Sequence, residues 1–265
     1  MTSSLFSLLF FGWLFTAMLM MVLWLLQRAR QDASHVDVAW SASLGMLACF
    51  YAVMAEGHMS RRFLLAALAG VWAFRLSLYL FVNRVWGKPE DGRYQSLRQH
   101  WNDKAQPYFF IFFQAQAVLA VIFSLPFLVI AADATPTFTW RDWVGLGVWL
   151  TAIIGESLAD RQLARFRADT RHRGKTCRVG LWRYSRHPNY FFEWLHWWTY
   201  VIIGFGSSLW WLTLIGPLLM LYLLFKVTGI PATEAQAVTS RGDDYRAYQR
   251  TTSAFIPWFP KTERV

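Results

Sequence analysis

The chain has 265 residues, of which 55% are apolar and only 16% are charged, and its mean hydropathy is +0.27. Such a composition leaves too little polar surface to cover a soluble globule, and it excludes a disordered chain, a collagen-like fibre and a charged coiled coil. The 16 Trp, 22 Phe and 10 Tyr residues are typical of a membrane protein, whose aromatic rings gather at the headgroup level. The net charge of +10 is compatible with nucleic acid, anionic lipid or an anionic cofactor, so the positions of the charges must distinguish these partners.

Apolar runs of about 20 residues, the length that a helix needs to cross the hydrocarbon core, recur along the chain. The first run is expected to be a retained transmembrane helix, because it lacks the basic segment and the small-residue cleavage site of a secretory signal. The fifth run carries Glu156 and Asp160 at its end, and the sixth is short. We predict an all-α polytopic membrane protein with about seven spans near 5–26, 36–54, 63–83, 108–131, 143–160, 190–205 and 208–227.

Basic residues are distributed very unevenly between the segments that connect these spans. With the N-terminus outside, 22 of the 26 Lys and Arg residues fall on cytoplasmic segments, and only Arg61, Arg62 and Arg141 fall on external ones. Cytoplasmic loops carry the excess of Lys and Arg, so the pattern predicts an N-out, C-in topology. Nucleic acid is disfavoured as a partner because the charges flank membrane spans. We expect one integral membrane domain over 1–265, with substrate-side helices in 1–135 and cofactor-binding helices and a cytoplasmic loop in 136–265.

Ionisable residues inside apolar spans are costly and are therefore functional candidates. Glu193 shares a helical face with Asn189 and His196, and Glu156, Asp160 and Arg167 align if the fifth helix continues past its span. Buried ion pairs between helices are the alternative for any single residue, whereas the whole cluster favours a polar cavity on the cytoplasmic side. The remaining intramembrane charges are Asp37, Arg75 and Lys226, of which Lys226 is expected to reach the interface.

Nine basic residues lie between Arg161 and Arg186, in the longest polar stretch of the chain. Topology and anionic lipid can account for such charges, but arginine also binds phosphate bidentately, so a phosphorylated cofactor is favoured. The chain has no G-x-G-x-x-G and no G-x-x-x-x-G-K-[ST] motif, so side chains would have to bind a nucleotide. His spacing does not suit a metal site, and a disulfide between Cys49 and Cys177 is not expected.

The segment Gly180-Leu-Trp-Arg-Tyr-Ser-Arg-His-Pro-Asn-Tyr-Phe-Phe-Glu193 resembles the signature of the steroid 5-alpha-reductase-like membrane proteins. The similarity is strongest to their bacterial branch, long described as a domain of unknown function, DUF1295. Asp37-Val-Ala-Trp40, the stretch 87–95 and the tail 245–257 are similar as well, so the resemblance covers most of the chain. It implies seven helices, a cytosolic NADPH site in the C-terminal half, and reduction of a carbon-carbon double bond conjugated to a ketone.

Carried over position by position, the resemblance implies a cofactor site and an incomplete catalytic pair. Asp37 stands where the family has an acid on the second helix, whereas Trp72 stands where the family has a tyrosine on the third. Asp37 could polarise a substrate ketone only in its protonated form, which burial would favour. The implied NADPH-binding residues are Asp160 and Arg167 (D-x6-R), Asn189 and Glu193 (N-x3-E), Arg186, His187 and Tyr190 of the signature, and Arg178, Tyr184 and Glu234.

The expected function is therefore an NADPH-dependent oxidoreductase that reduces the enone of a steroid-like or other hydrophobic lipid taken from the bilayer. It would reside in the bacterial inner membrane with its active site facing the cytoplasm. An S-adenosylmethionine-dependent methyltransferase of the isoprenylcysteine or phospholipid type is the alternative, because R-H-P-x-Y-x-x-E over 186–193 and the tail 245–257 resemble those enzymes almost as well. A third possibility is a lipid-binding or scaffold protein without catalysis.

Overall fold

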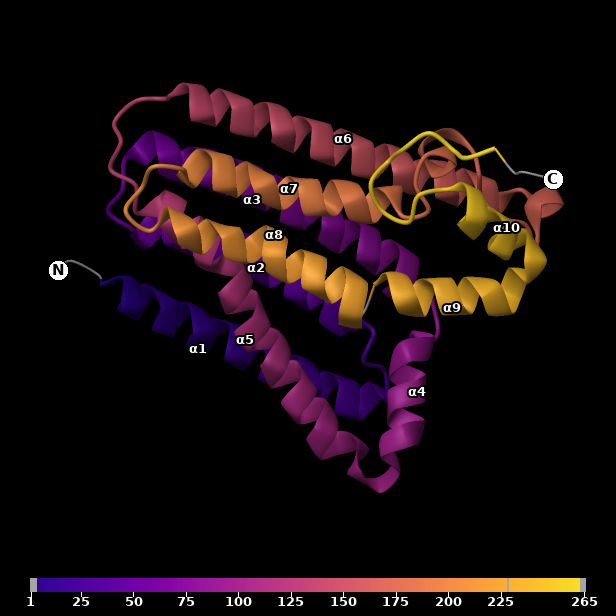
Figure 1. The fold of residues 1–265 in the computed structure, drawn as a ribbon. Helices are drawn as coiled ribbons and strands as arrows, with labels where there is room; N and C mark the ends of the chain where they lie inside the picture. Colours follow the sequence, from indigo (N-terminus) through magenta and orange to yellow (C-terminus); the bar gives the residue numbers. More distant parts are fainter. Residues whose placement is uncertain (1–3, 228, 263–265) are drawn as a thin grey trace. The chain divides into compact units, whose positions relative to one another are not determined.

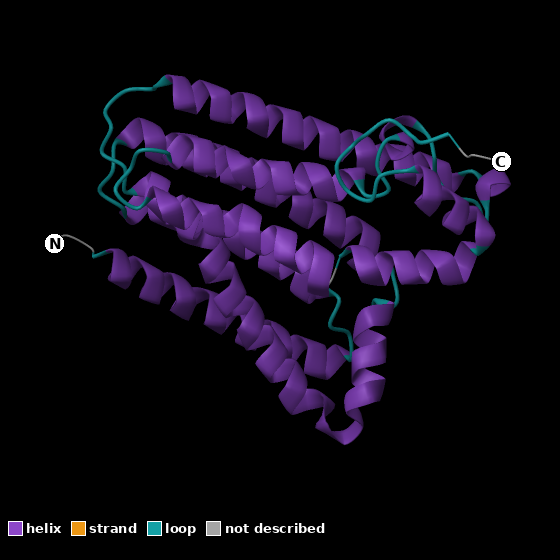
Figure 2. Cartoon of the chain, viewed as in Figure 1, coloured by secondary structure: helices purple, strands orange, loops and turns teal. Residues whose placement is uncertain are grey.

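The computed structural model describes residues 4–227 and 229–262. The regular secondary structure of these residues is all helical: loops connect the helices, and no strand is present among them (Figure 2). The predicted all-α fold is confirmed. The described residues group into two compact units, of which unit 1 comprises Met1–Thr139 and Gly204–Ile215, and unit 2 comprises Trp140–Ile203 and Gly216–Val265. The segment that follows helix α7 (Pro188–Gly204) therefore belongs with the N-terminal helices.

Unit 1 is built on contacts among α1, α2, α3 and α5 (Figure 1). Gly45 of α2 lies so close to α3 that a Cβ there would meet the Cβ of Ala73 at 2.7 Å, which is the close approach that small residues allow between membrane helices. Phe109 and Phe113 of α5 fill the core beneath α1 and α2. The helices of unit 1 are α1 (Leu5–Arg30), α2 (His35–Met54), α3 (Met59–Leu80), the π-helical turn η1 (Phe81–Val85), α4 (Gly92–Trp101), η2 (Asn102–Lys104), α5 (Ala105–Ala131) and η5 (Trp210–Leu214).

Unit 2 pairs a long helix, α6, with α7 and carries its polar segments at one end. A Cβ on Gly155 of α6 would meet the ring of Phe192 of α7 at 2.4 Å, so glycine is required for this contact. Pro188 opens α7 at a position where a helix does not need an N–H donor. The helices of unit 2 are α6 (Trp140–Ala168), η3 (Thr170–His172), η4 (Gly180–Arg183), α7 (Pro188–Gly204), α8 (Ile215–Tyr222), η6 (Leu223–Val227), α9 (Ile230–Arg241) and α10 (Asp243–Thr251).

Five helical stretches of the described chain are long and apolar enough to cross a membrane. The apolar character of α6 is interrupted by Asp142, Glu156 and Asp160, and the 17 residues of α7 extend only about 26 Å against a core of about 30 Å. The chain is therefore a membrane protein, and the count of seven spans stays a prediction. The five stretches are Leu5–Arg30, His35–Met54, Met59–Val85, Gly92–Ala131 and Trp210–Arg241.

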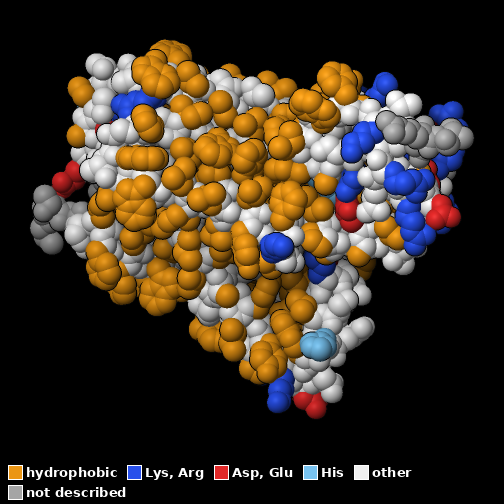
Figure 3. Space-filling model, viewed as in Figure 1, with side chains coloured by type: hydrophobic (Ala, Val, Ile, Leu, Met, Phe, Trp, Pro, Cys, Tyr) orange, Lys and Arg blue, Asp and Glu red, His pale blue; other side chains and the backbone are white. Residues whose placement is uncertain are grey.

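Apolar and basic side chains are exposed on different parts of the described chain. Phe6, Val22, Phe63, Phe74 and Ile111 are among the large apolar side chains that are exposed on the long helices, as expected of surfaces that face lipid. Lys and Arg gather where α9 and α10 lie in unit 2 (Figure 3). The polar chemistry of unit 2 is thus concentrated at the end that carries the signature segment.

Candidate functional site

The signature segment is fastened onto the C-terminal half of α6. The Asn189 amide donates to the Asp160 carboxylate at 3.3 Å, which joins the first turn of α7 to a buried acid of α6. The Trp182 indole donates to the Ala159 carbonyl at 2.9 Å. Gly180 has a φ of 57°, and a Cβ there would meet the Gln162 side chain at 2.2 Å, so this turn requires glycine. The predicted neighbours Asp160 and Asn189 are therefore in contact.

Glu234 of α9 is the centre of a compact polar cluster, which we call the Glu234 cluster. Its Oε1 accepts from Arg186 Nε at 2.6 Å and lies 3.3 Å from His187 Nε2. Its Oε2 accepts from the Gln249 amide at 2.8 Å, and the Tyr245 hydroxyl donates to Oε1 at 3.4 Å. Burial and the Glu234 carboxylate raise the pKa of Tyr245 to about 12, so this hydroxyl remains a donor at neutral pH. Arg186, His187 and Glu234, predicted as site residues, are thus brought together.

The C-terminal tail wraps around the same segment and makes the cluster rigid. The Ser185 hydroxyl donates to the Phe255 carbonyl at 2.8 Å, and the Arg186 amide donates to the Ser253 carbonyl at 2.8 Å. The Tyr248 hydroxyl donates to the carbonyls of Trp182 and Ser185. Because these partners lie more than 60 residues apart in sequence, the signature and the tail form one structural element.

Tyr184, Tyr190 and Glu193 occupy three different surroundings. Tyr184 accepts through its carbonyl from the Trp258 amide at 2.9 Å, so its backbone holds the tail. Tyr190 stacks on His187 with ring centroids 5.2 Å apart, and its hydroxyl lies 3.3 Å from that of Thr233. Glu193, one turn further along α7, accepts from the Trp197 indole at 3.3 Å. Tyr190 is therefore the aromatic residue of the signature that lies against the Glu234 cluster.

Two of the arginines predicted to hold phosphates are neutralised within the protein. Arg186 is largely buried and binds Glu234 together with the carbonyls of Gln249 and Thr252. Arg178 binds the carboxylate and the carbonyl of Asp244 at 2.9 and 2.7 Å. These two residues hold α9 and α10 against the signature, which corrects the expectation that their charges are available to a cofactor. The other arginines of the 161–186 stretch are all exposed, and of these Arg171 is paired with Asp169; they are Arg161, Arg165, Arg167, Arg171, Arg173 and Arg183.

The contact between Asp244 and the 173–179 loop should depend on pH, because it requires the ionised Asp244 carboxylate. Burial opposes ionisation of Asp244, but the Thr176 amide at 2.7 Å and the Arg178 guanidinium outweigh it and lower its pKa. A lowered pKa in the folded state means that the contact stabilises the fold above about pH 4 and is lost as the pH falls further. The protection factor of the Thr176 amide, which is its exchange rate corrected for the intrinsic pH dependence, should therefore fall below about pH 4 in the wild type.

The variant Asp244→Asn should show fast exchange at Thr176 at neutral pH and little further change on acidification. Asp243→Asn is the matched control, because the neighbouring Asp243 carboxylate pairs with Arg246 on the same helix and is 96% exposed. Slow exchange in Asp244→Asn at pH 7 would contradict the assignment.

In unit 1, Asp37 lies in a cluster that the sequence did not reveal. Its Oδ2 accepts from Arg84 at 3.0 Å and from Arg93 at 2.7 Å, and its Oδ1 accepts from the Tyr94 hydroxyl at 2.7 Å. Asp37 thus lies in a polar network with two arginines and a tyrosine, and its expected role towards a substrate ketone stays a prediction. Asp91 caps α4 through the Arg93 amide and also binds the Arg93 side chain, which fixes that arginine.

The three partners of Asp37 were missed because they come from other elements. Arg84 lies in η1, and Arg93 and Tyr94 lie in the first turn of α4, more than 45 residues away in sequence. The stretch Asp91-Gly-Arg-Tyr94 was the sequence signal that could have indicated these partners. Asp91 is a typical N-cap residue, and the arginine and tyrosine that follow it can both donate hydrogen bonds to a carboxylate. Within the described residues, no group of three or more His, Cys, Asp or Glu side chains could hold a metal ion.

Comparisons with known proteins agree with the signature. A family model described as "Protein of unknown function (DUF1295)" matches residues 23–252. The "Uncharacterized protein C594.04c" of Schizosaccharomyces pombe is 26% identical over 222 residues, which cover 74% of this chain and 64% of the relative. The chain thus spans less than two thirds of that relative's length, and no solved structure gives a significant match. Since the family match covers far more than half of the sequence, the chain belongs to the DUF1295 family.

Proposed function

We propose that the protein is an NADPH-dependent membrane reductase that transfers hydride to the conjugated carbon-carbon double bond of a steroid-like or other hydrophobic lipid. The observation that supports this most is the set of exposed arginines in the last two turns of α6. Arg161, Arg165 and Arg167 are exposed there, while Asp160 on the same helix is buried against Asn189. Such a donor set fits the phosphates of NADPH, because guanidinium groups bind phosphate oxygens bidentately.

Each group of unit 2 has a distinct role in this proposal. The exposed arginines bind phosphates, and Arg167 is the family-pattern residue among them. The Asp160 carboxylate fixes the amide of Asn189, and the Glu234 cluster fixes His187 and the stacked Tyr190. Asn189 and Tyr190 would then orient the nicotinamide, with Glu193 one turn behind them on α7. NADPH, when bound, would supply the hydride to the β carbon of the enone, and a proton taken up at the α carbon would complete the reduction.

Asp37 acts in the proposed reaction by positioning other groups. Tyr94 is buried, whereas the side chains of Arg84 and Arg93 are 39% and 44% exposed. A guanidinium has five N–H donors, so both arginines retain donors after binding Asp37. These donors would stabilise the negative charge that grows on the ketone oxygen, and Asp37 holds both of them in place. The missing third-helix tyrosine is thus replaced by arginines in this proposal.

The orientation of the chain in the membrane is part of the same proposal. The end of unit 2 that carries the Glu234 cluster faces the cytoplasm, where NADPH is available, and the N-terminus lies outside. The membrane is the bacterial inner membrane, and the substrate enters from the bilayer. The excess of Lys and Arg around α9 and α10 supports this orientation (Figure 3).

A methyltransferase that uses S-adenosylmethionine is the second candidate, and one observation favours it. Arg178 and Arg186 are bound to Asp244 and Glu234, so part of the arginine loop does not act on phosphates. S-adenosylmethionine has no phosphate and would need fewer free cations. The proposals differ most clearly in the nucleotide that they require.

Purification in mild detergent followed by mass spectrometry of released small molecules tests the choice directly. We expect NADP(H) in roughly stoichiometric amount. S-adenosylmethionine without NADP(H) would replace the reductase by the methyltransferase, and neither molecule, together with no binding of either in titration, would favour a lipid-binding protein without catalysis.

Arg167→Ala should weaken NADPH binding about tenfold to a hundredfold, because a hydrogen bond to a charged group is worth about 1.5 to 3 kcal/mol. Binding of NADH, which lacks the 2′-phosphate, should be reduced less if Arg167 contacts that phosphate. Arg171→Ala is the matched control on the same polar segment, since Arg171 is exposed and paired with Asp169. Titration calorimetry measures both variants, and equal losses in the two would contradict a specific role for Arg167.

A further inference from the structure

The exposed face of α6 fits the hydrocarbon core of a bilayer, although the helix contains three acids. Asp142, Glu156 and Asp160 are all buried, so none of them interrupts this face. No charged side chain is exposed between Trp140 and Arg161. The helix rises about 32 Å between these two residues, and the hydrocarbon core is about 30 Å thick. The uncharged face of α6 therefore matches the core from end to end.

Two tryptophans mark one end of this face. Trp140 and Trp143, in the first turn of α6, are 68% and 66% exposed. Tryptophan is enriched at the boundary between membrane and water, so these side chains indicate one interface at the start of α6. The second interface is then expected near Arg161, where exposed charge begins again.

The C-terminal tail is attached to α6 at the level of this second interface. Two hydrogen bonds of 2.9 Å join η4 to the stretch 159–162 of α6. Tyr184 follows η4 directly, and its carbonyl accepts from the Trp258 amide at 2.9 Å. The tail, which folds back after α10 (Figure 1), thus lies about one hydrocarbon thickness from the tryptophans at the start of α6.

The tail exposes three large apolar side chains at this level. Ile256, Trp258 and Phe259 are 58%, 70% and 77% exposed. Their backbone is held on both sides, because the Lys261 amide donates to the Thr251 carbonyl at 2.8 Å and Trp258 is bonded as described above. A backbone held in this way keeps the three side chains at the surface, and exposed apolar patches mark contacts with a membrane or with another protein.

Two cations flank the apolar residues of the tail. Lys261 follows them in the chain, and Arg183 directly precedes the Tyr184 that binds Trp258. Both cations are exposed, and neither forms an ion pair with another described residue. Anionic headgroups attract such charges, and the tryptophan ring suits the headgroup level. The charge and the position along α6 favour a bilayer over a protein as the partner of this patch.

We infer that residues 256–261 are an interfacial anchor, which inserts its three exposed apolar side chains into the headgroup region of the bilayer. Arg183 and Lys261 contact the phosphates of anionic lipids beside it. Because the tail also binds the signature segment through Ser185 and Arg186, the anchor holds the Glu234 cluster at the membrane surface. The inference does not depend on the proposed reductase activity or on which side of the membrane the tail lies.

Spin labels on the full-length protein test the anchor in lipid nanodiscs that contain one third phosphatidylglycerol. Cys49→Ser removes the exposed native cysteine, and Cys177 is buried, so Ile256→Cys or Phe259→Cys then introduces the labelling site. Asp243→Cys is the control, since this side chain of α10 is 96% exposed. We expect the ratio of oxygen to nickel-chelate collision rates to be at least threefold higher at 256 and 259 than at 243. Equal ratios at the three positions would overturn the inference.

Charge variants test the contact with anionic lipid. In the chain labelled at Phe259, the combination of Arg183→Gln and Lys261→Gln should lower the collision ratio at least twofold in these nanodiscs and have no effect in phosphatidylcholine alone. Arg171→Gln is the matched control and should change neither ratio, because Arg171 is exposed but paired with Asp169. Thermal unfolding identifies any variant that fails to fold. A folded double variant with an unchanged ratio would overturn the assignment of the two cations to anionic lipid.

Discussion

Replacing Glu234 by Ala should lower the free energy of unfolding by about 3 to 5 kcal/mol, because it leaves a largely buried arginine without its counter-ion. The side chains of Arg186 and Glu234 are only 11% and 15% exposed. The change also removes the acceptor of Gln249 and Tyr245, so the signature segment, α9 and α10 lose their common partner. Thermal and denaturant unfolding in detergent measure the loss.

Asp243→Ala is the matched control for Glu234→Ala. Asp243 also pairs with an arginine, Arg246, but both side chains are exposed, and surface ion pairs contribute less than about 1 kcal/mol. Glu234→Gln should lie between the two, since it keeps a carbonyl acceptor and removes the charge. Equal stability of Glu234→Ala and Asp243→Ala would show that the Glu234 cluster does not stabilise unit 2.

This prediction also changes the role expected of Glu234. Four donor groups already converge on its two oxygens, so the carboxylate has little remaining capacity for a ligand. In the proposed reductase, Glu234 would therefore act on the cofactor indirectly, by holding His187 and the Tyr190 ring that stacks on it. A Glu234 variant that loses the nucleotide while His187 and Tyr190 keep their positions would contradict this indirect role.

Helices and local spacing were predictable from the sequence because they depend on neighbouring residues. Glu156, Asp160 and Arg167 could align only if the helix continued past the predicted span 143–160, and α6 does extend from Trp140 to Ala168. The four-residue and three-residue spacings in the signature placed Asn189, Glu193 and His196 on α7. The family could be recognised from the same segment, as the match over residues 23–252 confirms.

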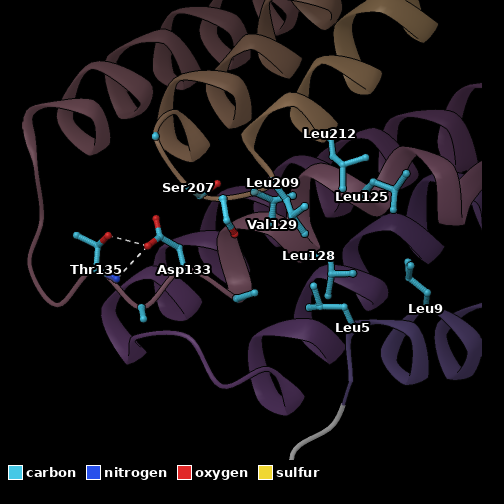
Figure 4. Close-up of a pocket in the computed structure, with 14 residues that line it drawn as sticks. Leu5, Leu9, Leu125, Leu128, Val129, Asp133, Thr135, Ser207, Leu209 and Leu212 are labelled. Carbon is cyan, nitrogen blue, oxygen red and sulfur yellow. Dashed lines mark hydrogen bonds between the residues drawn. The ribbon is translucent and has the colours of Figure 1, made fainter.

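The partners of charged residues were not predictable, because a sequence shows a charge but not the side chain opposite to it. Arg178 and Arg186 have the appearance of phosphate ligands until their contacts with Asp244 and Glu234, 66 and 48 residues away, are known. Asp37 has the appearance of an isolated acid until α4 brings Arg93 and Tyr94 to it. A cavity of about 520 Å³ in unit 1 was missed for the same reason, since its walls come from the start of α1, the end of α5 and the 206–212 segment (Figure 4).

Asp37→Asn should reduce turnover about 100-fold to 1,000-fold and leave NADPH affinity within about twofold of the wild type. Loss of one well-placed donor to a developing oxyanion costs a factor of this size, and Asp37 positions two such donors, Arg84 and Arg93. NADPH oxidation is followed with a 3-oxo-Δ4 steroid and with a long-chain acyclic enone, and cofactor affinity is measured separately by titration.

Two further variants of the Asp37 cluster decide whether the carboxylate acts through the arginines. Asp91→Asn is the matched control, because asparagine still caps α4 and Asp37 still binds both arginines, so turnover should fall less than about tenfold. Tyr94→Phe removes one hydrogen bond to Asp37 and leaves both ion pairs, so it should also cost about tenfold or less. A larger loss in Tyr94→Phe than in Asp37→Asn would contradict a role of Asp37 through the arginines, and unchanged turnover in Asp37→Asn would remove the cluster from the reaction.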